Sequence, residues 1–107
     1  MYAQITFIEA PLDQMPRLRE IIRVKYLPVV RARPGFQAGY LLEQDDDPDS
    51  AQLVLFWEDQ VAVEDFNRTG VLQASIHALA AEVPGLRVQR QGYVVRMVAG
   101  PKPEAQV

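Results

Sequence analysis

The pattern of hydrophobic and polar positions predicts a strand and then a helix in the first third of the chain. Residues 2–9, YAQITFIE, alternate loosely and carry apolar groups on both faces, which favours a strand. Asp13 is a candidate N-cap, and Pro16 is tolerated in the first helical turn. The apolar positions of this helix are Met15, Leu18, Ile22 and Val29. We expect a kink near Pro28, because a proline within a helix cannot donate a backbone hydrogen bond.

The next segment predicts a β-hairpin. RPGF at 33–36 ends the helix, and QAGYLLEQ and AQLVLFWED are typical of two strands joined by the acidic turn DDDPDS. Both alternating sets of side chains in the second strand are apolar, with Leu53, Leu55 and Trp57 on one face and Val54 and Phe56 on the other. Helices can cover only one face of such a sheet, so the second face needs another partner.

The last third predicts two helical pieces and a strand. Residues 61–83 have helical spacing, but RTG at 68–70 interrupts it, since a glycine inside a helix costs about 1 kcal/mol relative to alanine. The stripe expected to pack on the sheet consists of Leu72, Ile76, Leu79 and Val83. The final strand is RVQRQGYVVRMV at 87–98, with Gly92 where a bend or bulge is expected. The polar, proline-rich residues 100–107 are expected to be a frayed tail after one domain at 1–99.

The order strand, helix, strand, strand, helix, strand predicts an α+β fold. Two interleaved βαβ units of this kind give a ferredoxin-like βαββαβ arrangement, in which a four-stranded antiparallel sheet carries both helices on one face. The second apolar face of the strand at 51–59 then favours a homodimer formed by sheet-to-sheet packing.

Composition narrows the classes of function. The chain has 107 residues, 49% of them hydrophobic and 23% charged, as expected for one soluble domain. Its net charge of -3 gives no electrostatic reason to expect nucleic acid or an anionic membrane as a partner. The absence of cysteine excludes disulfides, thiolate metal sites and a cysteine nucleophile. The N-terminus lacks the basic leader of a signal peptide, and we expect a cytoplasmic protein.

The acidic turn has part of the spacing of a calcium-binding loop. Asp45, Asp47 and Asp49 alternate as the ligands of such a loop do. The sixth position of the loop requires glycine and is Ser50, while the twelfth requires glutamate and is Phe56. We therefore interpret the segment as a solvated turn and expect no metal site.

Three segments occur in a characteristic order: the helix end RPGFQAGYLLEQ, the strand LVLFWED with a Trp-Glu pair before a helix, and NRTGVLQA in the second helical region. Over residues 2–98 the chain resembles the antibiotic biosynthesis monooxygenase-like family of dimeric α+β barrels. The resemblance implies a pocket between helices and sheet for a flat, often aromatic molecule. It also implies oxidation of anthrone-like or quinol-like substrates by molecular oxygen without metal or flavin, while some relatives degrade haem.

The resemblance also locates the positions where relatives commonly carry histidines in the second helical region. Counted from Trp57, these positions fall at Phe66 and Val71, both apolar in this chain. Phe66 stands where the haem-degrading branch has a tryptophan, and His77 lies one residue beyond the place of its haem-ligand histidine. His77 also points away from the apolar stripe on a helical wheel, which favours a solvent-facing or subunit-facing side chain over a direct role.

Six residues are candidate ligand contacts, and no catalytic residue is assigned. Aromatic faces, phenol groups and polar side chains near the helix break suit a flat ligand, although the same groups also serve cores and helix ends. The candidates are Trp57, Tyr40, Phe66, Asn67, Tyr26 and His77. Two functions stay open: a cofactor-independent monooxygenase-like protein that binds an aromatic or quinone-type molecule, and a non-catalytic ligand-binding or scaffold module of the same fold. A haem-binding or haem-degrading relative is a third alternative.

Overall fold

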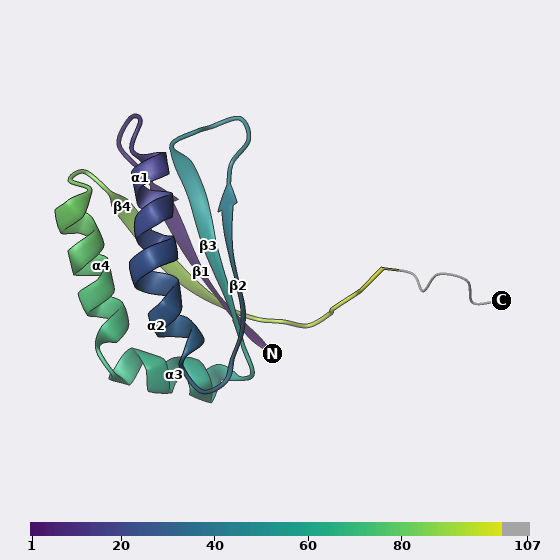
Figure 1. Ribbon diagram of the computed structural model, residues 1–107. Coiled ribbons are helices and arrows are strands. Elements are labelled where there is room, and N and C mark those ends of the chain that lie inside the picture. Colours follow the sequence, from purple (N-terminus) through teal and green to yellow (C-terminus); the bar gives the residue numbers. More distant parts are fainter. Residues whose placement is uncertain (102–107) are drawn as a thin grey trace.

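The structure, a computed structural model that describes residues 1–101, is an antiparallel sheet with its helices on one face (Figure 1). In chain order the elements are β1 (Tyr2–Glu9), α1 (Met15–Ile21), η1 (Ile22–Tyr26), α2 (Leu27–Arg31), β2 (Phe36–Glu43), β3 (Ser50–Trp57), α3 (Gln60–Arg68), α4 (Val71–Glu82) and β4 (Arg87–Val94). The four strands lie in the order β2-β3-β1-β4. This is the strand order of the ferredoxin-like fold, so the predicted fold class is confirmed.

The first helical region begins after a tight change of direction at Asp13. This residue has a φ of 65°, in the left-handed region that aspartate tolerates better than most residues. The helix N-cap is Gln14, and no side chain accepts a hydrogen bond there. The expectation that Asp13 caps the helix is therefore wrong, because its backbone serves the turn that leads from β1 into α1.

The first helical region contains the π-helical turn η1, which joins α1 to α2 just before Pro28. A π-helical turn uses about one residue more than an α-helical turn and so changes which side chains face the core. Val30 is fully buried, whereas Val29 is 40% exposed. The apolar stripe thus continues through Tyr26 to Val30, and the expectation that Val29 belongs to it is wrong.

Helices cover one face of the sheet and leave the other face bare. The pairs Gln4↔Leu55 and Thr6↔Leu53 of β1 and β3 face the helices, while the alternate pair Ile5↔Val54 faces the other way. The buried residues of the helix-facing core include Ile8, Leu18, Ile22, Val30, Leu53, Leu55, Trp57, Phe66 and Leu72. No helix of the described part of the chain covers the opposite face, which we call the open face (Figure 1). The apolar side chains of β3 thus divide between the two faces as predicted.

The second helical region breaks at the expected glycine. Gly70 has a φ of 74° between α3 and α4, a conformation that suits glycine because it has no Cβ. The Asp59 carboxylate caps α3 by accepting a hydrogen bond from the Ala62 N–H at 2.9 Å. On α4, Leu72 is buried and Ile76 is packed against the core, so the predicted docking stripe is confirmed.

The last strand, β4, ends at Val94, four residues before the predicted end at 98. Its neighbour β1 begins at Tyr2, which pairs with Val94, and the next backbone hydrogen bond runs from the Val95 N–H to the Met1 carbonyl at 3.1 Å. The chain then leaves the sheet (Figure 1). Pairing with β1 continues without a register shift through Gly92, so the expected bulge is absent. Most of the tail predicted at 100–107 lies outside the described residues.

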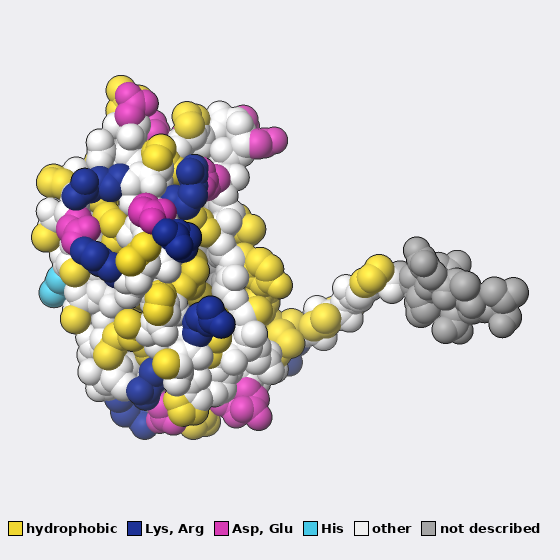
Figure 2. Space-filling model, viewed as in Figure 1, with side chains coloured by type: hydrophobic (Ala, Val, Ile, Leu, Met, Phe, Trp, Pro, Cys, Tyr) yellow, Lys and Arg dark blue, Asp and Glu magenta, His cyan; other side chains and the backbone are white. Residues whose placement is uncertain are grey.

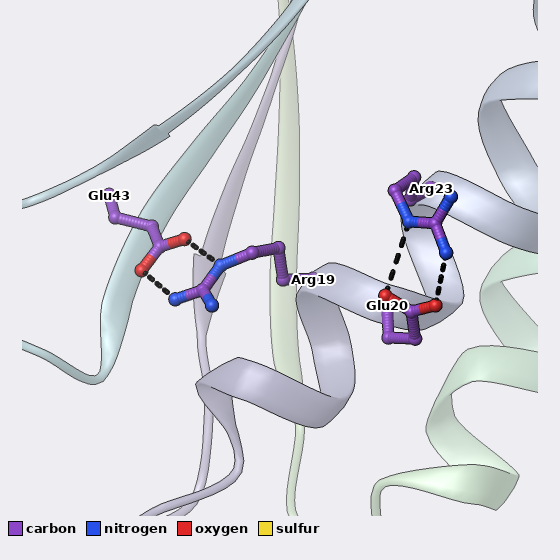
Figure 3. Close-up of polar contacts among 4 residues, drawn as sticks. All are labelled: Arg19, Glu20, Arg23 and Glu43. Atoms are coloured by element: carbon purple, nitrogen blue, oxygen red, sulfur yellow. Dashed lines mark hydrogen bonds and ion pairs between the residues drawn. The ribbon is translucent and has the colours of Figure 1, made fainter.

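Polar contacts tie the hairpin to the helices and close its turn. The Arg19 guanidinium donates two hydrogen bonds to the Glu43 carboxylate of β2, at 2.6 and 2.8 Å (Figure 3). Within the first helical region, Arg23 pairs with Glu20, three residues before it. In the acidic turn, the Asp47 carboxylate accepts from the Ser50 hydroxyl at 2.9 Å and from the Asp49 N–H at 3.1 Å. These bonds support the interpretation of DDDPDS as a turn.

Candidate functional site

A polar cavity of about 210 Å³ lies between the sheet and α3. Strands β1 and β4 form its floor, because Gln4 of β1 is paired with Gly92 of β4. The lining residues are Tyr2, Gln4, Val63, Asn67, Arg90, Gln91 and Gly92. The cavity therefore brings one of the sequence candidates, Asn67, together with polar side chains of two neighbouring strands.

Gln4 is the most unusual member of this cavity. Its side chain is 6% exposed, and its Oε1 atom is buried without a hydrogen-bond partner among residues 1–101. Burying a polar oxygen without a partner costs free energy of roughly 1–3 kcal/mol, and a hydrogen-bond donor on a bound molecule would recover this cost. Gln4 and Thr6 are the buried polar residues among those described, and both project from β1 toward the helices. A bound molecule with a hydroxyl group would satisfy the orphaned oxygen.

Arg90 and Tyr26 determine the charge and the hydrogen-bond donors of the site. Arg90 is opposite Thr6 in the β1–β4 register, on the helix-facing side of the sheet. Burial raises the pKa of the Tyr26 phenol well above its ordinary value of 10.0, and the nearby positive charge of Arg90 opposes this only in part. Tyr26 therefore stays protonated at physiological pH and can donate a hydrogen bond, while Arg90 supplies a permanent positive charge.

A second, narrow apolar cavity of about 30 Å³ lies under α4 and shares no lining residue with the polar cavity. The two are neighbours through Thr6, which lines this cavity and is paired with Arg90 of the polar one. The lining of the apolar cavity includes Thr6, Ile22, Tyr26, Leu72 and Ile76, and only the threonine and tyrosine among these five carry a polar side chain. An apolar recess beside a polar mouth suits a flat aromatic molecule whose oxygen substituents point to Arg90 and Gln4. The two volumes are below the roughly 300–1,000 Å³ typical of ligand pockets, so a molecule of several rings requires α4 to shift outward.

Trp57 and Phe66 pack in the core beside this site. Trp57 is fully buried. The centroid of its ring is 5.5 Å from that of Phe36, at an interplanar angle of 78°, and 5.3 Å from that of Phe66, at 30°. Neither Trp57 nor Phe66 lines the two cavities. The Trp57 indole Nε1 is buried, and no described residue accepts a hydrogen bond from it. In this structure both rings serve the packing that supports α3.

Two other sequence candidates lie away from the cavities. Tyr40 projects from the open face, where its side chain is 55% exposed. Its ring contacts that of Phe56 edge to face, with 6.1 Å between the ring centroids. His77 is exposed on α4, and the single histidine appears as a cyan patch at the surface (Figure 2). This is the solvent-facing position that its place on the helical wheel predicts. The structure thus brings Tyr26 and Asn67 to the site but not Tyr40 or His77.

Sequence reasoning missed Gln4, Thr6 and Arg90. The signal lies in strand parity: Gln4 and Thr6 alternate with Ile5 and Phe7, and only the register with β3 shows which set faces the helices. Arg90 lies between Gln89 and Gln91, so nothing in its local sequence marks it. Charged side chains also gather over the helix layer, where they are ordinary surface groups (Figure 2).

The assembled groups provide hydrogen bonds and positive charge. Amide, phenol and guanidinium groups can hold the oxygen atoms of an aromatic molecule and stabilise negative charge that develops on them. Within residues 1–101, no three histidine or acidic side chains lie together as a metal-binding group. No helix of the described part of the chain is long and apolar enough to cross a membrane.

The chain matches one protein family by its sequence. The sequence model described as "Antibiotic biosynthesis monooxygenase" matches residues 1–78, which is most of the chain. No curated protein matches.

Solved structures share the fold over nearly the whole chain. The monooxygenase from the gene ActVA-Orf6 of Streptomyces coelicolor, in complex with Nanaomycin D, has a TM-score of 0.77 and 15% identity, with 94% of this chain and 92% of that chain covered. A variant of MhuD with two manganese protoporphyrin IX molecules bound per active site has a TM-score of 0.76 and 22% identity, covering 94% and 100%. A variant of SnoaB, a cofactor-independent oxygenase from Streptomyces nogalater, has a TM-score of 0.75 and 14% identity, covering 91% and 95%. At these identities the likeness shows the fold.

Proposed function

Because the chain belongs to the antibiotic biosynthesis monooxygenase family, we propose that it binds an electron-rich aromatic molecule between its helices and its sheet and oxidises it with molecular oxygen, without a cofactor. The observation that carries this proposal is the orphaned Gln4 Oε1, buried in a cavity that Arg90 also lines. Two of the similar structures are described as oxygenases, and one holds an organic ligand. These support the proposal by analogy of fold.

The residues of the cavity suit a substrate that can itself reduce oxygen. Arg90 would lower the pKa of a bound phenol by stabilising its anion, and the Tyr26 hydroxyl would donate a hydrogen bond to the same oxygen. The electron-rich anion then donates electrons to molecular oxygen. For an anthrone, two hydrogen atoms of the methylene group are replaced by one carbonyl oxygen, and the second oxygen atom leaves as water with those hydrogens. The anthrone is oxidised and the oxygen molecule is reduced.

Oxygen uptake with 1,8-dihydroxyanthrone tests this proposal. We expect uptake above the uncatalysed rate that survives a metal chelator, with a fall of roughly 10- to 100-fold in Arg90→Gln, as for loss of a group that stabilises developing charge. Arg31→Gln, at an exposed position of α2, is the matched control and should keep the rate. Binding of the anthrone without uptake would instead favour the non-catalytic ligand-binding module. Absence of both binding and uptake would contradict the proposal for this substrate class.

We also propose that the protein is a homodimer whose subunits pack through the open face. Large apolar side chains remain exposed on this face among residues 1–101, and several such side chains on one face mark an interaction site. They are Phe7, Tyr40, Leu42 and Tyr93. A second copy of the same sheet would cover them by face-to-face packing.

A further inference from the structure

We propose that residues Val95–Val98 of each chain extend onto a second copy and fill a hollow in its open face. This inference rests on the proposed sheet-to-sheet dimer and adds that each subunit contributes a segment to the other. It accounts for two features that a single chain leaves without partners, namely a strand-forming tail and a large hollow at the far end of the sheet.

The tail has the composition of a strand but has no neighbouring strand among the described residues. The segment VVRMV is rich in β-branched residues, and the apolar pattern predicts a strand to residue 98. Pairing stops near Val95 because β1 begins at Tyr2. Beyond that point Met97 is 92% exposed and Val98 is 74% exposed. Figure 1 shows this part of the chain leaving the body of the protein, where hydrophobic side chains line it (Figure 2). Unpaired strand-forming residues of this kind are templates for pairing with another chain.

The hollow has a volume of about 450 Å³ and lies where β1 ends and β3 begins. Phe7, Leu42 and Gln52 lie side by side on the open face there, because Gln52 pairs with both of its neighbours. In the β1–β4 register the hollow is at the Glu9↔Arg87 end, whereas the tail leaves from the Tyr2↔Val94 end. The tail therefore starts at the opposite end of the sheet from the hollow and runs away from it.

A second copy related by a two-fold axis removes this separation. If the axis lies between the two sheets and crosses their strands, the strand directions are reversed in the partner, and each tail comes over the other subunit's hollow. Side chains alternate along an extended segment, so Val95 and Met97 can face the hollow while Arg96 points to its rim. The rim carries the Glu9 carboxylate, whose single ion pair among the described residues is a 3.6 Å contact with Arg87. Arg96 thus complements a negative charge at the hollow.

Disulfide trapping between single-cysteine variants tests the exchange directly, because the natural chain has no cysteine. Isotope-labelled Met97→Cys protein is mixed with unlabelled Leu42→Cys protein under oxidising conditions, and the mixed pair is identified by mass after separation without reductant. Val24→Cys is the matched control, since Val24 on η1 is 52% exposed and Leu42 is 50% exposed. We expect the mixed disulfide to accumulate with Leu42→Cys and only in trace amounts with Val24→Cys, because a disulfide forms only between Cα atoms within about 7 Å.

Native mass spectrometry of the unmodified protein separates the two levels of the proposal. A dimer that gives the mixed disulfide supports tail exchange. A dimer in which Met97→Cys links equally to Leu42→Cys and Val24→Cys, or to neither, would refute tail exchange and leave the sheet-to-sheet dimer standing. A monomer would refute both.

Discussion

The phenol of Tyr2 crosses the backbone of Gly92 on the neighbouring strand, and its hydroxyl oxygen occupies the space that a Cβ at residue 92 would need. Both residues line the polar cavity. Gly92 therefore matters for the position of a ring at the mouth of the candidate site, and a side chain at residue 92 cannot be added without moving that ring.

Gly92→Ala should accordingly displace Tyr2 and lower the free energy of unfolding by about 1–3 kcal/mol, the usual cost of forcing extra volume into a packed region. Urea unfolding measures this effect. Gly100→Ala is the control, because a Cβ at residue 100 meets open space. In a Tyr2→Ala background the same Gly92→Ala change should cost little, since the obstructing ring is gone. An equal cost in both backgrounds would show that the contact with Tyr2 is not the cause.

Trp57 should behave as a core residue. Because its side chain is fully buried between Phe36 and Phe66, Trp57→Ala is expected to lower the free energy of unfolding by about 3–5 kcal/mol. Trp57→Phe should cost less, because a smaller aromatic ring still fills part of the space and the buried N–H, which has no partner among residues 1–101, is removed. Thermal unfolding measures both. A stable Trp57→Ala variant that has lost only ligand binding would instead assign this residue to the ligand.

The open face should control the oligomeric state. Tyr40→Glu places a charge on the proposed interface without disturbing the core, and it should give a folded monomer. Val24→Glu, at a similarly exposed position on η1, should leave the mass of the assembly unchanged. Analytical ultracentrifugation distinguishes these results. A Tyr40→Glu protein that keeps the wild-type mass would place any interface elsewhere.

Acidification should weaken the contact between Arg19 and Glu43. The hydrogen bonds from Arg19, aided by its charge and partly opposed by desolvation, hold the pKa of Glu43 below its ordinary value of 4.5. The Glu43 carboxylate therefore takes up a proton at a higher pH in the unfolded chain than in the folded protein. The contact stabilises fully above pH 4.5, and its contribution disappears as the pH falls through the lowered value.

Glu43→Gln should consequently reduce the loss of stability between neutral and acidic pH, as measured by the urea midpoint across a pH series. Glu64→Gln, at an exposed site on α3, provides the matched control and should follow the wild-type curve. Identical curves for wild type and Glu43→Gln would mean that this exposed pair contributes nothing measurable, as many surface pairs do.

The fold could be predicted from the sequence because each element carries its own periodicity and stop signal. The two-sided apolar strand at 51–59 and the break at Gly70 both appear in the structure as expected. The prediction that Val29 belongs to the apolar stripe of the first helix was wrong, because a π-helical turn changes which side chains face the core. The hydrophobic pattern alone does not reveal such a change in helical pitch. The predicted end of β4 was wrong because the length of a strand depends on its partner strand as well as on the strand propensity of its residues.

The candidate site was harder to predict, because it depends on contacts between distant segments. Tyr26 and Asn67 could be named from their residue types, but Gln4 and Arg90 become significant only when β1 and β4 are paired under α3. Tyr40 illustrates the reverse case: its phenol suits a ligand equally well, yet strand parity places it on the open face.

The most direct test of the central claim is to locate a bound aromatic molecule by NMR. Two-dimensional ¹H–¹⁵N spectra would be recorded during titration with 1,8-dihydroxyanthraquinone, a stable oxidised counterpart of the anthrone substrate. We predict that the largest shift changes fall on Gln4, Thr6, Asn67 and Arg90, and that they are lost in Arg90→Gln while that variant keeps the wild-type spectrum elsewhere. Shift changes centred on Tyr40 and Leu42 of the open face, or none at all, would contradict the claim.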